Sequence, residues 1–492
     1  MFGRIVVSAG FALALSAAGF MAQAPTQTPP LTSSDQSDTE SGYVGSRACS
    51  KCHQQIYRSY SRTDMGRSIS EPSLSLLNNI PASVTVFDSA SKRHFEVAVR
   101  DGQLWQSEFE IGTDGKDIFR DTHKVDWIIG AGANGFGAIV KRGDYLFEAP
   151  LSFYSQTNSW ALSPGYEFAN YGFNRPILPG CIACHSGRPR AVSGGNGRFL
   201  EPPFAELAVA CENCHGPGQA HVSEMLLSEP AAGRSTSIVN PAKLSHWLAD
   251  NICMSCHQTG DARALQPGKH YWDFRPGIPL EHTLALLMVP PSREHPLEND
   301  LLEHYFSMTL SKCYRSSGGR LSCITCHDPH IQPSAGEAPA YFRAKCLSCH
   351  SEKSCAVPLA VRQRKDPPDD CAGCHMPKRD IKVISHSALT NHRIIAESGE
   401  AFPEVLPTPQ TPGLIHLNAI PGQQDSVPPL VLLEAYGQVT ASHPEYRQRY
   451  WDLAKQLEKS HSADVAVLKA LADWATQPKT AEAGEKAIEY LD

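Results

Sequence analysis

The chain has 492 residues, of which 41% are hydrophobic and 19% are charged, so it is neither fibrous nor disordered as a whole. Its formal net charge of -7 argues against a protein that binds nucleic acid by broad neutralisation of phosphates. Sixteen cysteines in a chain of this length do not indicate a small disulfide scaffold, so their spacing has to define their role.

The first 24 residues have the pattern of a secretory signal peptide. A basic start and an apolar run precede an A-x-A cleavage site at 22–24. The apolar run is short for a membrane span, so an uncleaved anchor is the less favoured alternative. Residues 25–41 are rich in Pro, Thr and Ser and predict a linker. We therefore expect an exported protein, periplasmic and soluble after signal cleavage.

Fourteen of the cysteines lie in seven copies of the pattern C-x-x-C-H. The motif cysteines are Cys49, Cys52, Cys181, Cys184, Cys211, Cys214, Cys253, Cys256, Cys323, Cys326, Cys346, Cys349, Cys371 and Cys374. The histidines that follow them are His53, His185, His215, His257, His327, His350 and His375.

This pattern is the attachment signal of c-type haem. Residues at i, i+3 and i+4 share one face of a helical turn, so two thiols can bind the porphyrin while the histidine reaches the iron. Zinc knuckles do not need the histidine, and thiol redox pairs belong in a βαβ context, so both explain the pattern less well. We expect seven covalently attached c-type haems.

A β-rich insert is predicted at about 82–160, in the long gap after the first motif. Apolar and polar residues alternate over 95–99 and again over 105–111, and Asp101-Gly102 between them predicts a hairpin. Residues 130–135 spell G-x-G-x-x-G, but strand-like sequence follows, which favours a glycine-rich turn over a nucleotide site. We expect the whole fold to be mainly α, with much irregular structure around the haems.

Each haem iron has a second axial position, which a histidine, a methionine or a substrate can occupy. His221 and His330 follow the third and fifth motifs across Pro-containing turns, so each is expected to bind the iron of a neighbouring haem. His386 and His392 follow the last motif and are also candidates. Weaker candidates are Met65, His304 and Met308.

Cys313 and Cys355 are the cysteines outside the motifs. Two spare cysteines in an oxidising compartment usually pair, so we predict a disulfide between them.

The C-terminal part follows a second proline-rich segment, 396–428, which predicts an extended linker. Apolar periodicity then predicts helices that start near 430 and continue over about 444–459, 463–475 and 480–491. Residues 429–492 are therefore expected to form helical hairpins.

Three segments, 211–221, 323–330 and 371–377, resemble the multihaem cytochromes of the cytochrome c-552/c-554 type. The similarity extends over about 42–395, and is greatest to the subset with C-terminal tetratricopeptide repeats. It implies closely stacked haems, mostly with two histidine ligands, that transfer electrons. It also implies that His221, His330, His386 and His392 are distal ligands.

We thus expect a heptahaem c-type cytochrome that relays electrons between a redox donor and an acceptor, with no catalytic residues and no nucleic-acid partner. The C-terminal helices would be a possible site for protein docking. The alternative is a multihaem oxidoreductase in which one open haem acts on a small nitrogen or sulfur species. The first haem was the candidate for this role, since no histidine follows its motif at a short offset.

Overall fold

The computed structural model describes residues 42–491, with internal gaps at 82, 228–236, 258–259, 292–303, 381–387, 398, 402–410, 424–426 and 479. The predicted signal peptide and first linker, and the candidate ligand His386, lie outside the described residues. Within the described part, no helix combines the length and apolar character needed to cross a bilayer.

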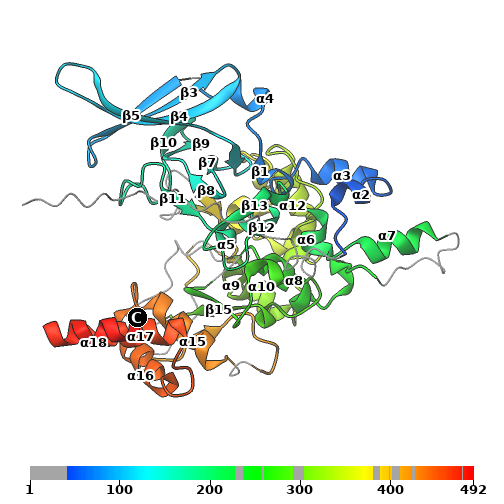
Figure 1. The fold of residues 1–492 in the computed structure, drawn as a ribbon. Coiled ribbons are helices and arrows are strands. Elements are labelled where there is room, and N and C mark those ends of the chain that lie inside the picture. The colour runs from blue at the N-terminus through cyan, green and yellow to red at the C-terminus, as the bar shows by residue number, and fades with distance from the viewer. Residues whose placement is uncertain are drawn as a thin grey trace, which may run out of the picture. The chain divides into compact units, whose positions relative to one another are not determined.

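A four-stranded antiparallel sheet follows the first motif. Its strands pair in chain order and are β2 (Ser83–Asp88), β3 (Arg93–Arg100), β4 (Gln103–Ile111) and β5 (Asp117–Lys124) (Figure 1). Asp101 and Gly102 form the two-residue turn between β3 and β4, with φ angles of 51° and 70°. Two positive φ angles are those of a type I′ turn, which suits Asp-Gly. The predicted hairpin is confirmed.

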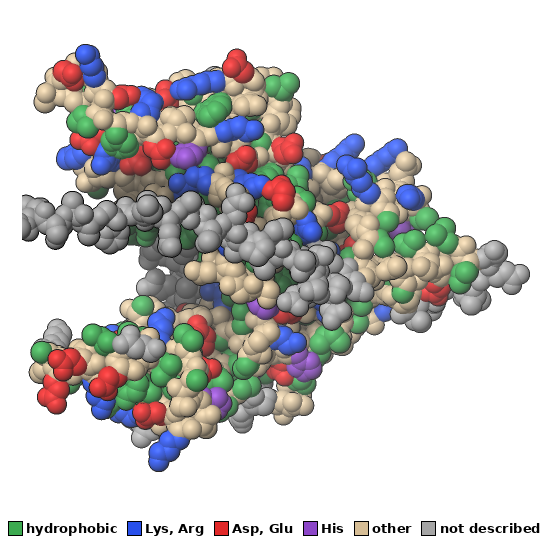
Figure 2. All heavy atoms as spheres, in the orientation of Figure 1, with side chains coloured by type: hydrophobic (Ala, Val, Ile, Leu, Met, Phe, Trp, Pro, Cys, Tyr) green, Lys and Arg blue, Asp and Glu red, His purple; other side chains and the backbone are tan. Residues whose placement is uncertain are grey.

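Charged side chains of both signs cover this sheet. Arg120 lies 2.6 Å from Asp117 and 2.8 Å from Glu96. Figure 2 shows basic and acidic side chains interspersed over the same strands. Ion pairs of this kind are typical of a solvated surface and contribute little to stability.

A second sheet has seven strands. It contains β1 (Ile69–Ser70), β6 (Trp127–Ile129), β7 (Gly135–Arg142), β8 (Tyr145–Glu148), β9 (Leu151–Tyr154), β10 (Ser159–Leu162) and β11 (Arg175–Ile177). Phe95 and Val97 of the first sheet share one buried apolar cluster with Ala138 and Val140 of the second. The two sheets therefore form a common core.

The glycine-rich segment 130–135 is the turn between β6 and β7. Gly130 and Gly132 have φ angles of 105° and 90°, and a strand follows directly at Gly135. A dinucleotide fingerprint requires a helix at this point, so the glycine-turn interpretation is confirmed.

Short helices and turns carry the motifs. The helices up to residue 375 are α2 (Ser46–Cys49), α3 (Gln54–Tyr60), α4 (Leu74–Leu77), α5 (Pro179–Ile182), α6 (Cys211–His215), α7 (Gln219–Leu226), α8 (His246–Met254), α9 (His304–Thr309), α10 (Lys312–Ser316), α11 (Cys323–Cys326), α12 (Ala338–Leu347), α13 (Leu359–Arg362) and α14 (Cys371–His375). The 3₁₀ turns are η2 (Met65–Arg67), η4 (Pro241–Lys243), η5 (Tyr271–Asp273), η6 (Leu280–His282), η7 (Glu352–Ser354) and η8 (Pro444–Tyr446).

Small sheets lie between these helices. They consist of β12 (Gly187–Ala191) with β13 (Phe199–Glu206), β14 (Ala262–Leu265) with β15 (Leu284–Met288) and β18 (Ile415–His416), and β16 (Lys378–Asp380) with β17 (Ala388–Thr390). β18 belongs to the segment predicted as an extended linker. The Asn418 side chain, which follows β18, bonds the backbone of Leu284 and Leu286, so this part of the segment is built into the sheet.

Four helices end the chain, in the stretches where the periodicity predicts them. They are α15 (Pro429–Val439), α16 (Arg447–Leu457), α17 (Val465–Ala475) and α18 (Ala481–Leu491). Val431 and Leu433 of α15 share a buried cluster with Ala264 and Leu287 of the β14–β15 sheet. The Gln438 side chain bonds the backbone N–H and C=O of Arg263 at 2.8 and 3.0 Å. α15 therefore provides hydrogen-bond partners for backbone groups on the open edge of β14.

The expectation of a mainly α fold is wrong, because the described residues contain sheets of seven and four strands as well as helices. Strands continue beyond the predicted insert, through β13 at Phe199–Glu206 and as far as β18 at Ile415–His416. The seven C-x-x-C-H motifs favour helix locally. Each motif needs only a single helical turn, however, so together they add little helix to the fold.

Leu433→Ala is expected to lower the free energy of unfolding by about 3 kcal/mol, because Leu433 is fully buried between α15 and the sheet. Leu491→Ala, at a position that is 65% exposed, should change it by less than about 0.5 kcal/mol. Chemical denaturation followed by circular dichroism would measure both. Equal effects would mean that α15 does not support the sheet.

Candidate functional site

Each C-x-x-C-H motif lies in or beside a helical turn. The backbone N–H of the histidine donates to the carbonyl of the first cysteine at 2.9 Å for His53, 2.8 Å for His257, 3.0 Å for His327 and 2.9 Å for His350. This i to i+4 bond places the first thiol and the imidazole on one face of the turn. At the second motif the bond differs, and His185 N–H donates to Ile182 at 3.0 Å.

Four motif imidazoles face a second imidazole from elsewhere in the chain. The ring centres are 6.3 Å apart for His53 and His221, 5.9 Å for His215 and His330, 5.8 Å for His257 and His304, and 6.2 Å for His327 and His392. Metal–imidazole bonds are about 2 Å long, so a metal ion between two such rings sets their centres roughly 6 Å apart. The four pairs therefore fit an iron bound on both sides.

Hydrogen bonds at Nδ1 orient several of these rings. Nδ1 of His215 lies 2.8 Å from the carbonyl oxygen of Val239, and Nδ1 of His375 lies 2.6 Å from that of Ile395. Among the facing histidines, Nδ1 of His392 lies 3.1 Å from the carbonyl oxygen of Thr390. A carbonyl accepts the Nδ1 proton and leaves the Nε2 lone pair for a metal, which is the usual arrangement of metal-ligating histidine.

The surroundings also keep these rings uncharged. Burial, together with neighbouring histidines, lowers the pKa of His257 to about 4 and that of His392 to about 3. Burial likewise lowers the pKa of His215 and His327. Neutral imidazole is the form that binds a metal, so these side chains are ready to do so at neutral pH.

Cysteines of different motifs lie against one another. The Cys211 thiol lies close to that of Cys49 and raises the pKa of Cys49. Cys253 acts in the same way on Cys323, and Cys256 on Cys184. The Cys346 thiol also lies close to that of Cys371. If these thiols hold porphyrins, as the motifs predict, the contacts would bring the expected haems together in pairs.

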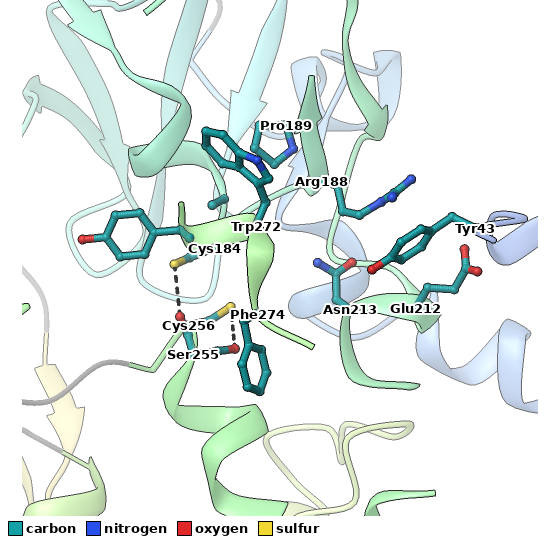
Figure 3. Close-up of a pocket in the computed structure, with 12 residues that line it drawn as sticks. Tyr43, Cys184, Arg188, Pro189, Glu212, Asn213, Ser255, Cys256, Trp272 and Phe274 are labelled. Carbon is teal, nitrogen blue, oxygen red and sulfur yellow. Dashed lines mark hydrogen bonds between the residues drawn. The ribbon is translucent and has the colours of Figure 1, made fainter. Parts of the chain in front are cut away.

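One of these contacts borders a pocket. Figure 3 shows Cys184 and Cys256 on either side of Ser255, whose carbonyl and hydroxyl oxygens lie 3.8 and 3.7 Å from the two sulfurs. The pocket is also lined by Tyr43 and Arg188, and the Arg188 guanidinium lies 3.5 Å from the centre of the Tyr43 ring. A positive charge thus borders the space beside two motifs.

Buried polar groups tie the first motif to the third. Glu212, which lies between the two cysteines of the third motif, is 4% exposed and accepts N–H groups of Val44 and Gly45 at 3.0 and 2.8 Å. It also accepts the N–H of Gly218 at 2.7 Å. The Ser46 hydroxyl accepts the N–H of Cys211 at 3.1 Å. The C-x-x-C-H pattern leaves the two positions between its cysteines open. In this motif, however, the buried contacts of Glu212 constrain one of them.

The fourth and fifth motifs are joined in a similar way. Asp250, three residues before Cys253, is 2% exposed and accepts the N–H of Cys323 at 2.9 Å. Ser46 likewise lies three residues before Cys49 and accepts the N–H of Cys211. In both junctions, the residue three before one motif caps the helical turn of another motif.

An ion-pair network joins the sixth motif to the seventh. Arg343, three residues before Cys346, lies 2.5 Å from Asp369, which is 9% exposed and precedes Cys371 by two residues. Arg362 pairs with the same aspartate and also lies 3.0 Å from Glu352. A partly buried network in which each arginine bridges two carboxylates fixes geometry better than an isolated surface pair does.

Some of the candidate distal ligands lie opposite a motif histidine in the structure, and others do not. The structure places His221, His330 and His392 opposite motif histidines, and it does the same for His304, which the sequence ranks lower. His304 lies 47 residues after its partner, so no short offset could reveal it. Met65 and Met308 are in none of the four facing pairs. Among the described residues, no imidazole faces His185, His350 or His375.

The predicted disulfide between Cys313 and Cys355 is wrong, because both residues are free thiols in the structure. Cys313 lies near Cys349, and burial raises the pKa of the Cys313 thiol. Cys355 instead lies near the guanidinium of Arg362. The two cysteines are close in sequence, but each has different neighbours.

Glu212→Gln is expected to lower the free energy of unfolding by about 1–3 kcal/mol, since it replaces a buried carboxylate that accepts three N–H groups. Glu71→Gln, at an exposed position, is the matched control and should have little effect. Thermal denaturation of both variants would test this. No difference between them would mean that Glu212 does not tether the first motif.

Comparisons with known proteins give one distant structural match. No family model matches the chain, and no curated protein matches it. The crystal structure of the outer cell wall cytochrome OcwA is similar with a TM-score of 0.42 and 14% identity, over 92% of this chain and 98% of that chain.

Proposed function

We propose that this chain is a multihaem c-type cytochrome that carries seven haems and relays electrons between redox partner proteins. The observation that carries the proposal is the set of four facing imidazole pairs, with ring centres 5.8–6.3 Å apart. Each pair contains one motif histidine, so the thiols that would hold a porphyrin lie beside the imidazoles that would hold its iron.

Haem iron, when bound, supplies reversible one-electron chemistry. The residues of this chain would determine whether each iron only transfers electrons or also binds a substrate. His221, His330, His304 and His392 would fill the distal positions of the first, third, fourth and fifth haems and exclude substrate from them. Two imidazole ligands also favour a low reduction potential, which suits relay rather than catalysis. The first haem is therefore no longer the candidate for an open site.

The contacts between motifs support one spatial order. Cysteine contacts link the first motif to the third, the fourth to the fifth and the sixth to the seventh. Cys214 lies near Cys253, and Cys326 lies near Cys349, which joins these pairs. We propose a relay in the order 1, 3, 4, 5, 6, 7, with the second haem attached to the fourth through the contact between Cys184 and Cys256.

A periplasmic location and docking to redox partners through the C-terminal helices also belong to this proposal. Since α15 is part of the core, docking would use the later helices. Ile488 and Leu491 of α18 are 56% and 65% exposed and lie on the last turns of the chain.

The protein purified from an export-competent host that attaches c-type haem is expected to gain the mass of seven haems. Mass spectrometry under denaturing conditions measures this, because thioether bonds survive denaturation. The control is expression without the attachment machinery, which should yield no haem. A chain that binds no haem covalently would contradict the proposal.

Electron paramagnetic resonance of the oxidised protein is expected to give at least four low-spin haem signals. Three of the pairs have ring planes within 16–19° of each other, which predicts rhombic spectra for those haems. A high-spin signal that responds to nitrite or nitric oxide would instead favour the alternative, a multihaem oxidoreductase.

His330→Met is expected to raise the reduction potential of one haem, because methionine is a weaker donor to ferric iron than imidazole. His270→Met, in an exposed side chain that pairs with Asp273, is the control and should shift no potential. Spectroelectrochemical titration measures both variants. An unchanged titration of His330→Met would remove His330 as a ligand.

A further inference from the structure

Two of the proposed distal ligands touch each other. The ring centres of His304 and His392 are 4.2 Å apart and their planes are 19° from parallel, which is a face-to-face stack. His304 also faces His257 at 5.8 Å, and His392 also faces His327 at 6.2 Å. Four imidazoles thus form a continuous series from the fourth motif to the fifth.

The backbone around the stack is held by Ser311, which is fully buried. Its hydroxyl accepts the N–H of Ile394 at 2.9 Å and lies 3.5 Å from the carbonyl oxygen of His392. Ser311 lies two residues after the end of α9, whose first residue is His304, and is the N-cap residue of α10. One side chain therefore fixes the segment that carries His392 against the helix that carries His304.

The His392 ring is also held from its own segment, by the hydrogen bond from Nδ1 to Thr390. Because that bond sets the plane of the His392 ring, the His304 ring that stacks on it takes nearly the same orientation. Aromatic rings at this separation are in van der Waals contact and have overlapping π faces.

We propose that the stack of His304 on His392 is a ligand-to-ligand contact that couples the fourth and fifth haems. This inference rests on the proposed function, since it assigns a role to two of the distal ligands. The contact provides an electron path from one iron to the other through the two stacked distal imidazoles, His304 and His392. It also makes the orientation of each distal ring depend on the other.

The first and third haems provide an internal comparison. Their motifs are linked through Cys49 and Cys211, as the fourth and fifth are through Cys253 and Cys323. Their proposed distal ligands are His221 and His330, and the structure shows no ring contact between these two described residues. A variant at His330 therefore removes a distal imidazole without removing a stack.

The test compares His392→Met with His330→Met by electron paramagnetic resonance and redox titration of the haem-loaded proteins. Methionine keeps six ligands on the iron, so each variant should change the signal of its own haem. We expect His392→Met to shift the spectrum of a second haem as well, whereas His330→Met should alter one haem only. If His392→Met also alters one haem only, the stack does not couple the two haems.

His304→Met gives the reciprocal measurement and replaces the first variant if that one does not fold. It should alter the fourth haem directly and shift the signal of the fifth. Haem content is measured for every variant by mass spectrometry. A wild-type protein without haem would overturn the proposed function, whereas full loading with independent signals would overturn only the coupling.

Discussion

Under the proposed function, the structure depends on one distance, the separation of about 6 Å that an iron bound between two imidazoles would impose on their ring centres. Four motif histidines meet this condition with partners that come from other parts of the chain. The backbone must therefore return repeatedly to earlier motifs. This accounts for the helices of one turn or little more at several motifs, such as α6, α11 and α14. The exceptions are α8 and α12, which have nine and ten residues and carry Cys253 and Cys346.

Buried polar side chains make these returns possible. Ser46, Asp250 and Arg343 each lie three residues before the first cysteine of a motif, and each bonds the neighbourhood of another motif. A buried acceptor without a partner is costly, so these bonds are specific as well as stabilising. The junctions thus use side chains that the C-x-x-C-H pattern does not include.

Much of the local chemistry could be predicted from the sequence, and much of the architecture could not. The spacing C-x-x-C-H encodes its own helical turn, and Asp101-Gly102 encodes its own hairpin, because both depend on neighbouring residues. Glu212, His304 and the separation of Cys313 from Cys355 depend on contacts between distant segments, about which spacing carries no information. The mainly α expectation failed for the same reason, since strand pairing past residue 160 is set by tertiary contacts.

The position of α15 in the sequence determines when the β14–β15 sheet is covered during synthesis of the chain. α15 follows every motif in the sequence, yet its Gln438 satisfies the open edge of β14 and its Leu433 covers the sheet. A chain truncated before residue 429 would keep all seven motifs but expose an unpaired strand edge beside an apolar face. Such an edge promotes aggregation. Under the proposed function, the last-synthesised helices would therefore protect a chain whose haems are attached at earlier positions.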